Sequence, residues 1–334
     1  MAIILHLRFL WSKLTLKMNE IAIAVENLVK VYKERSSTPV RALDGLSLQV
    51  RKGEIFGLLG RNGAGKTTLL RILTTLIQPT SGSVQVSGFD VQKNSLDVRK
   101  TICVVLQENA AELYLSVKDN FATYARFHSI PRAEFRERLD RVVAQFGLQD
   151  YLNQKVIDLS GGLKRRLQVA KVFMIDRPVV FLDEATTGMD PINKRATLNA
   201  VREQARMGRT IFLTTHILEE AEELCDTIAI IDRGTCLATG DLHAIKSLVS
   251  PVHELAFTFE SLDPAMLEKL RALPLLKFSH GKNTVEMSVK GDPLSTLGLV
   301  TEIAKTGRVI HFEASSASLE DVFLELLDAK GPHS

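Results

Sequence analysis

The residue types and spacing that could do chemistry begin at Gly60. The run Gly60-Arg-Asn-Gly-Ala-Gly-Lys-Thr67 fits the pattern G-x-x-x-x-G-K-[ST]. An apolar strand pattern precedes it and a helical pattern over 68–76 follows, which is the context that a phosphate-binding loop requires. Glycines let backbone N–H groups close on phosphates, Lys66 can reach the β- and γ-phosphates, and the Thr67 hydroxyl can hold Mg²⁺. We therefore expect a nucleotide to contact Gly60, Asn62, Gly63, Ala64, Gly65, Lys66, Thr67 and Thr68.

Two neighbouring carboxylates, Asp183 and Glu184, follow the apolar strand predicted over 179–182. At a strand end, Asp183 can bind Mg²⁺ directly or through water, and Glu184 can polarise an attacking water as a general base. The alternative is a strand end that is merely capped by acids. His216 ends a further apolar run, where an imidazole could contact the γ-phosphate or hold the water. A purely structural histidine is the alternative there.

A second glycine pair, Gly161-Gly162, follows Ser160 and precedes a basic amphipathic helical pattern. Ser160 is typical of a helix N-cap, and the two glycines leave backbone N–H groups open. A simple helix cap is one interpretation. The other is a second phosphate-binding helix end, which makes sense if it serves the nucleotide of another subunit.

These motifs need elements that position them, and the hydrophobic pattern supplies strands and helices in alternation. Strand-like alternation from Ile21 and again over 46–50 predicts a β-rich opening. Residues 93–175 are predicted to be mainly helical, and strands follow. Alternating strands and helices predict a parallel sheet flanked by helices. The predicted helices cover 116–127, 132–146, 163–175 and 191–206, and the later strands cover 179–182, 210–214 and 227–231.

A smaller α+β domain is predicted after the Ser250-Pro251 junction. Its order is βαββαβ with one trailing helix, which indicates a ferredoxin-like fold over 251–330. Its strands are predicted at 253–260, 275–279, 284–290 and 308–313, and its helices at 263–272, 294–306 and 318–328. We thus divide the chain into an extension (1–18), an α/β nucleotide-binding domain (19–247, its helical part about 93–175) and this C-terminal domain.

Composition excludes several classes of protein. The chain has 334 residues, 45% of them hydrophobic and 24% charged, as in an ordinary globular protein. Its net charge of +3 resides in residues 1–17, so the neutral remainder argues against a nucleic-acid partner. The 3 cysteines are too widely spaced to suggest a zinc site or a disulfide framework.

Residues 1–17 mix aliphatic side chains with three cations. A signal peptide, a helix lying on a membrane surface and an upstream start before Met18 all remain open. No apolar run approaches the roughly 18 residues that span a bilayer, so we do not expect this chain to cross a membrane by itself.

Taken in order, the motifs resemble those of an ABC-transporter ATP-binding subunit. The resemblance covers about residues 20–245 and includes the Walker A loop (60–67), the signature (159–162), Walker B (179–184) and the His216 switch. It implies that Tyr32 stacks on the adenine and that Asp190 belongs to the D-loop. It also implies that Gln107 lies in the lid, where it contacts Mg²⁺ and links the nucleotide to the partner. In that family two subunits pair head to tail, with ATP between one Walker A loop and the other signature.

One departure from the family motif and one further resemblance indicate a particular branch of the ABC family. Leu163 stands where the family usually has Gln, which resembles the drug-export branch. The ending over 318–326 resembles ATPases of ABC-2-type exporters of drugs, lipids or polysaccharides, the daunorubicin-resistance type among them. We therefore expect a Mg²⁺-dependent ATPase that forms a homodimer with a separate ABC-2-type membrane permease. Such a subunit is cytoplasmic and peripheral to the inner face of the cell membrane.

Two alternatives to an exporter remain. A non-transport ABC ATPase of translation or DNA repair would usually carry two cassettes or a long coiled coil, and this chain has neither. An importer ATPase would usually have a β-barrel-like C-terminal domain rather than a βαββαβ pattern. The cargo cannot be read from this subunit.

Overall fold

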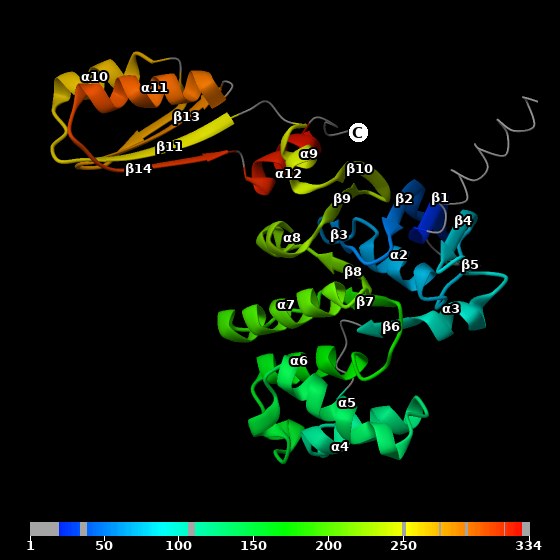
Figure 1. The fold of residues 1–334 in the computed structure, drawn as a ribbon. Coiled ribbons are helices and arrows are strands. Elements are labelled where there is room, and N and C mark those ends of the chain that lie inside the picture. The colour runs from blue at the N-terminus through cyan, green and yellow to red at the C-terminus, as the bar shows by residue number, and fades with distance from the viewer. Residues whose placement is uncertain are drawn as a thin grey trace, which may run out of the picture. The chain divides into compact units, whose positions relative to one another are not determined.

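A computed structural model describes residues 20–33, 39–105, 111–248, 252–273, 275–290, 293–316 and 318–328 (Figure 1). The chain divides into two compact units, Met1–Asp241 and Leu242–Ser334. The sequence pattern predicts that the first domain ends at residue 247. Helix α9 (Leu242–Lys246) instead belongs to the second unit, where it contacts α12 (Leu319–Asp328).

A six-stranded sheet forms the centre of the first unit, in the order β10-β9-β3-β8-β7-β6. All neighbours pair in parallel except the last hairpin, β9–β10. Every residue of β3, β7 and β8 is buried, as expected for parallel strands covered on both faces. The strands are β3 (Ile55–Leu59), β6 (Ile102–Val105), β7 (Val179–Asp183), β8 (Thr210–Thr215), β9 (Thr227–Asp232) and β10 (Thr235–Gly240).

The β-rich opening predicted from sequence is confirmed as a second, antiparallel sheet in the order β2-β1-β4-β5. Helix α2 (Lys66–Leu73) contacts both sheets, through β2 and β4 on one side and β7 on the other. Its apolar face joins a core in which Phe56 stacks on Phe212 with ring centroids 5.4 Å apart. The strands are β1 (Ile21–Tyr32), β2 (Val40–Arg51), β4 (Ser81–Val86) and β5 (Phe89–Asp90).

The helical part of the first unit lies beyond the β6 edge of the parallel sheet (Figure 1). Residues 93–175 are not helical throughout, because 102–105 form strand β6 beside β7. Four apolar residues are too few to separate a strand from a helix by periodicity, and only pairing with β7 decides. Besides α2, the helices described in the first unit are α3 (Ser95–Thr101), α4 (Val117–Phe127), α5 (Arg132–Gln145), α6 (Gly161–Val172), α7 (Pro191–Arg206) and α8 (Leu218–Leu224), with 3-10 turns at Gln149–Tyr151 and Val156–Asp158; α7 and α8 follow the helical part in the chain.

The second unit has the predicted βαββαβ order with a trailing helix. Its antiparallel sheet runs β12-β13-β11-β14, the strand order of a ferredoxin-like fold. Helices α10 and α11 cover one face of this sheet (Figure 1), and Leu255, Phe257 and Phe259 lie buried in its own core. The elements are β11 (Val252–Phe259), α10 (Pro264–Arg271), β12 (Leu275–His280), β13 (Thr284–Lys290), α11 (Pro293–Thr306) and β14 (Val309–Ser316).

Within the part of the chain that the structure describes, no helix is both long and apolar enough to span a bilayer. Cys103, Cys225 and Cys236 are free thiols.

The core of the second unit is separate from those of the first, which predicts separate responses of the two units to mutation. Phe257→Ala should lower the unfolding free energy of the second unit by about 3–5 kcal/mol, because a buried aromatic ring is lost from its core. Hydrogen exchange read peptide by peptide should then show faster opening in 252–328 only. Phe212→Ala is the matched control and should act on the first unit alone. Equal loss of protection in both units from either variant would contradict independent cores.

Candidate active site

A cavity of about 370 Å³ opens where the parallel strands end at their carboxyl edge. The loop after β3, the residue after β7 and the residue after β8 meet there, although more than 150 residues separate the first from the last. Parallel α/β sheets place their ligand sites at this edge. The lining residues are Ala42, Arg61, Asn62, Gly63, Gly65, Lys66, Thr67, Thr68, Glu184 and His216.

The loop before α2 takes a shape that only glycine accommodates. Gly63 and Gly65 have φ of 84° and 109°, in the left-handed region. A Cβ on Gly65 would also lie 2.7 Å from the carbonyl oxygen of Ala42. The loop can therefore turn sharply and leave the N–H groups at the start of α2 facing the cavity, which suits a phosphate.

Lys66 holds a positive charge at the cavity wall. Only 6% of the residue is exposed, and its ammonium donates to the carbonyl oxygens of Gly60 at 2.6 Å and Arg61 at 3.3 Å. Burial lowers the pKa of Lys66, whereas the carboxylates of Glu184 and Asp183 raise it. An anionic phosphate at this position would favour the charged form further.

Asp183 and Glu184 differ in their surroundings although they are neighbours. Asp183 is 3% exposed and accepts a hydrogen bond from the Thr214 hydroxyl, and burial raises the pKa of its carboxyl group. Glu184 faces the cavity, and its Oε1 lies 3.0 Å from Nδ1 of His216. A carboxylate paired with an imidazole can hold a water and accept its proton.

The backbone of Glu184 is strained. Its φ is 46°, in a region that costs a residue other than glycine about 1–3 kcal/mol. Its N–H donates to the carbonyl oxygen of Thr214 at 3.0 Å and to the Thr214 hydroxyl at 3.2 Å. Such outliers gather at functional sites, where the surrounding structure maintains them.

The remaining predicted residues lie at different places. The Tyr32 hydroxyl is 3.5 Å from that of Thr68, so this half-exposed ring stands beside the phosphate loop. Ser160 caps α6 by accepting from the N–H of Leu163 at 3.3 Å, as predicted. Asp190 caps α7, and its carboxylate would lie 3.0 Å from a Cβ on Gly162. Neither Asp190 nor Ser160-Gly161-Gly162 lines the phosphate cavity. Gln107 lies outside the described residues.

Three residues that hold this site were not found from sequence. Thr214 bonds both carboxylate-bearing residues, and Arg165 donates to backbone carbonyls behind them. Glu220, 1% exposed, accepts from Thr215 at 3.0 Å, from Lys194 at 3.0 Å and from Thr186. It thereby ties the end of β8 to the turn after β7. A threonine, an arginine and a glutamate carry no motif, and only their tertiary contacts reveal them.

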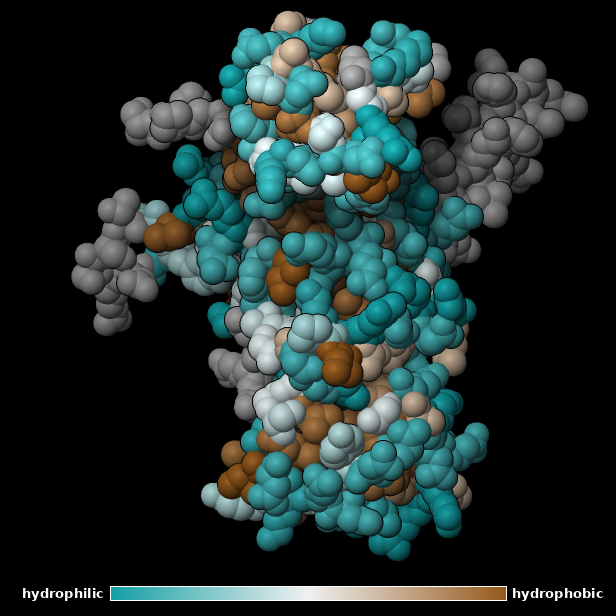
Figure 2. Space-filling model, turned by 90° about the vertical axis from the view of Figure 1, so that its left-hand side faces the viewer, coloured by the Kyte–Doolittle hydropathy of each residue, from teal (hydrophilic) through white to brown (hydrophobic). Residues whose placement is uncertain are grey.

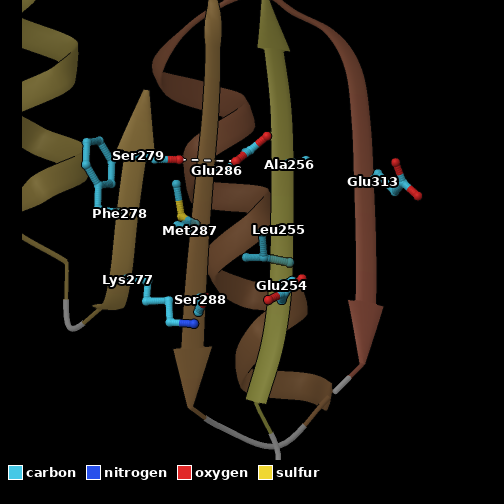
Figure 3. Close-up of a pocket in the computed structure, with 10 residues that line it drawn as sticks. All are labelled: Glu254, Leu255, Ala256, Lys277, Phe278, Ser279, Glu286, Met287, Ser288 and Glu313. Atoms are coloured by element: carbon cyan, nitrogen blue, oxygen red, sulfur yellow. Dashed lines mark hydrogen bonds between the residues drawn. The ribbon is translucent and has the colours of Figure 1, made fainter. Parts of the chain in front are cut away.

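A larger hollow, about 770 Å³, lies on the open face of the C-terminal sheet (Figure 3). Three glutamates line it with one lysine, and the Ser279 hydroxyl donates to Glu286 at 3.1 Å. An acidic lining repels phosphates, which disfavours nucleotide binding in this hollow. Its lining is Glu254, Leu255, Ala256, Lys277, Phe278, Ser279, Glu286, Met287, Ser288 and Glu313.

Comparison with known proteins agrees with this geometry. The family model "ABC transporter" matches residues 43–187. The daunorubicin/doxorubicin resistance ATP-binding protein DrrA of Streptomyces peucetius is 35% identical over 309 residues, which cover 91% of this chain and 92% of that protein. The chain belongs to the ABC transporter ATP-binding subunits. The Nod factor export ATP-binding protein I of Ralstonia nicotianae is likewise 35% identical and covers 91% of this chain and 93% of its own length.

Solved structures of ABC ATP-binding subunits share the fold of the first unit. One, described as the ATP-binding subunit of an ABC transporter, has a TM-score of 0.61 and 26% identity, and covers 68% of this chain and 92% of its own. The ABC subunit described here thus binds and hydrolyses ATP as part of an exporter, and its relatives support the drug-exporter branch. They do not favour the non-transport alternative.

Glu184→Gln should slow ATP hydrolysis about 10²- to 10⁴-fold, the range lost with a general base. ATP binding should persist, because the amide keeps the shape of the side chain and the phosphate loop is untouched. Equilibrium binding of ATP and steady-state release of phosphate measure the two effects. Near-normal turnover would remove Glu184 from the base role, and loss of binding would make it a structural residue.

Proposed function

We propose that two copies of this chain pair head to tail and hydrolyse ATP in two composite sites. The observation that carries this proposal is the position of Ser160-Gly161-Gly162, which lie outside the phosphate cavity of their own chain. They open the 12-residue helix α6, whose first turn contains no acid. A helix start with free N–H groups and no negative charge attracts a phosphate. In a head-to-tail pair that phosphate belongs to the partner's ATP.

Each of the site residues of this chain then has its own role in ATP hydrolysis. Lys66 and the N–H groups of the 60–67 loop neutralise charge on the β- and γ-phosphates. Glu184 orients water for attack on the γ-phosphate and accepts its proton, and His216 holds the Glu184 carboxylate. Tyr32 stacks on the adenine beside this loop, and Asp190 positions the signature of its own chain.

Mg²⁺ fits the donor set at this site. The Thr67 hydroxyl and the Asp183 carboxylate are hard oxygen donors, which Mg²⁺ prefers together with phosphate and water. Burial disfavours the charged form of Asp183, and a nearby dication would favour it. When bound, the ion neutralises phosphate charge. Gln107 belongs to the same proposed set.

The membrane partner is proposed to be an ABC-2-type permease that docks on the helical part, which places the subunit at the inner face of the cell membrane. Apolar side chains gather over this part of the surface, at the lower end of Figure 2. We define the 113–115/157 patch as Leu113, Tyr114, Leu115 and Ile157, whose exposures are 39%, 78%, 37% and 43%. Backbone bonds join its two segments, from Ile157 N to Leu113 O at 2.8 Å and from Val156 N to Leu115 O at 3.0 Å. Exposed apolar clusters mark interaction sites.

We also propose that the permease, and not this subunit, selects the transported substrate. Relatives with the same 35% identity are named for daunorubicin/doxorubicin resistance and for Nod factor export, so identity in this subunit does not follow the cargo.

Complementation tests the composite sites. Lys66→Ala and Ser160→Arg should each abolish hydrolysis alone, since one removes the phosphate cation and the other blocks the signature. Mixed dimers should regain one intact site, so turnover should return to roughly a quarter of normal at equal mixing, from half the dimers with one of two sites. A Lys66→Ala chain mixed with the double variant Lys66→Ala/Ser160→Arg is the control and has no intact site. Absence of rescue in the first mixture would rule out head-to-tail sharing.

Tyr114→Asp should release the subunit from its membrane partner, because a charge enters the middle of the 113–115/157 patch. In cells that also express the permease, less of the variant should sediment with membranes. The purified variant should still hydrolyse ATP within about twofold of normal, since Tyr114 does not line the cavity. Leu96→Asp, at a 68% exposed site on α3, is the matched control. Unchanged sedimentation of Tyr114→Asp would exclude this patch as the docking site.

A further inference from the structure

Arg165 is a buried cation in an unusual position. It lies on α6, five residues after Ser160, and only 8% of it is exposed. Its guanidinium reaches away from α6 to the turn that follows β7. There it donates hydrogen bonds to backbone oxygens. Burial lowers its pKa, whereas the nearby carboxylates of Asp183 and Glu184 raise it and so favour its charged form.

These bonds hold three consecutive peptides. Nη2 donates to the carbonyl oxygen of Asp183 at 2.7 Å and to that of Glu184 at 3.1 Å, and Nε donates to that of Ala185 at 3.1 Å. Nη1 donates to Gln168 Oε1 at 2.9 Å, which fixes the guanidinium on its own helix. The planar fork of arginine suits such multiple contacts, whereas the ammonium of lysine is a single point charge on a flexible stem.

The central peptide of the three belongs to the strained residue. Glu184 has a φ of 46°, and Thr214 binds its N–H from the β8 side. Arg165 binds the carbonyl of the same residue from the α6 side. The left-handed turn is therefore clamped between two elements, and its geometry decides where the Glu184 carboxylate points.

We propose that Arg165 is a positioning residue that couples the signature helix to the Glu184 carboxylate of the same chain. The coupling rests on the composite sites proposed above. The start of α6 contacts the partner's ATP, and Arg165 connects the same rigid helix to the Glu184 that serves the chain's own ATP. One rigid helix thereby carries both the signature and the side chain that holds the Glu184 turn of its own chain.

Arg166 provides a matched comparison on the same helix. It is 7% exposed, similar to Arg165, but its Nη1 donates to the carbonyl oxygens of Phe146 and Gly147 at 3.3 and 3.4 Å. Those contacts lie in the helical part and not at the turn after β7. The two arginines therefore lie on the same helix, carry the same charge and are similarly buried. They differ in the backbone carbonyls that they bind.

The first experiment compares Arg165→Lys with Arg166→Lys. We expect kcat for ATP hydrolysis to fall about 10- to 100-fold in Arg165→Lys, the loss typical of a misplaced catalytic group, with KM for ATP within about twofold. Arg166→Lys should keep kcat within about twofold. Thermal unfolding of both variants reports stability. If Arg165→Lys keeps normal kcat, or loses kcat only in step with its stability as Arg166→Lys does, the proposal is wrong.

The second experiment locates the effect in one chain. In mixtures of Lys66→Ala and Ser160→Arg chains, the working site takes Glu184 from the Ser160→Arg chain and the signature from the other. Adding Arg165→Lys to the Ser160→Arg chain should lower turnover as in the homodimer, and adding it to the Lys66→Ala chain should lower it far less. The reverse pattern would mean that Arg165 acts on the signature and would overturn the proposal. Failure of the parent mixture to regain turnover would instead contradict the composite sites and leave the first experiment decisive for Arg165.

Discussion

Parallel pairing of β3, β7 and β8 is the constraint on which the site depends. Register places Leu59 beside Thr215 and Asp183 beside Thr214, so the three strands end at one edge within a residue of each other. The phosphate loop, the acidic pair and His216 emerge from these ends. A slip of one residue along a strand would turn each of its side chains to the other face of the sheet. Because all three strands are buried on both faces, apolar packing against α2 and the helical part fixes the register.

The carboxyl edge of the parallel sheet also brings together ionisable groups whose charged forms are disfavoured by burial. Desolvation lowers the pKa of Lys66 and raises that of Asp183, and each group is kept near an opposite charge. Other buried polar groups support this edge: Thr214 bonds both acidic residues, and Glu220 connects the end of β8 to the turn after β7. Preorganised polar groups of this kind can stabilise charge that develops on a phosphate without reorganising.

The second unit differs from the first in its core, in the direction of its strands and in the exposure of its sheet. Its core is separate, and its sheet is antiparallel, with helices on one face and an open, glutamate-bearing other face. None of the described residues that line the phosphate cavity come from it. A ferredoxin-like unit with its own core can change its surface without disturbing the catalytic edge.

The sequence by itself determined those local features that depend on a short pattern of residue types. The phosphate loop needs glycines at fixed spacing, and Ser160 before two glycines predicts the start of a helix. The βαββαβ order of the second unit follows from hydrophobic periodicity and turn residues. Long elements such as α7, predicted at 191–206, were also placed from pattern, because a long segment shows its hydrophobic period clearly. Tertiary structure alone decided the rest. Strand β6 exists because residues 102–105 pair with β7, and Arg165 and Glu220 matter because backbone and side chains distant in sequence converge on them. Local patterns record the conformation of a segment, whereas convergence depends on strand register and helix packing that no single segment contains.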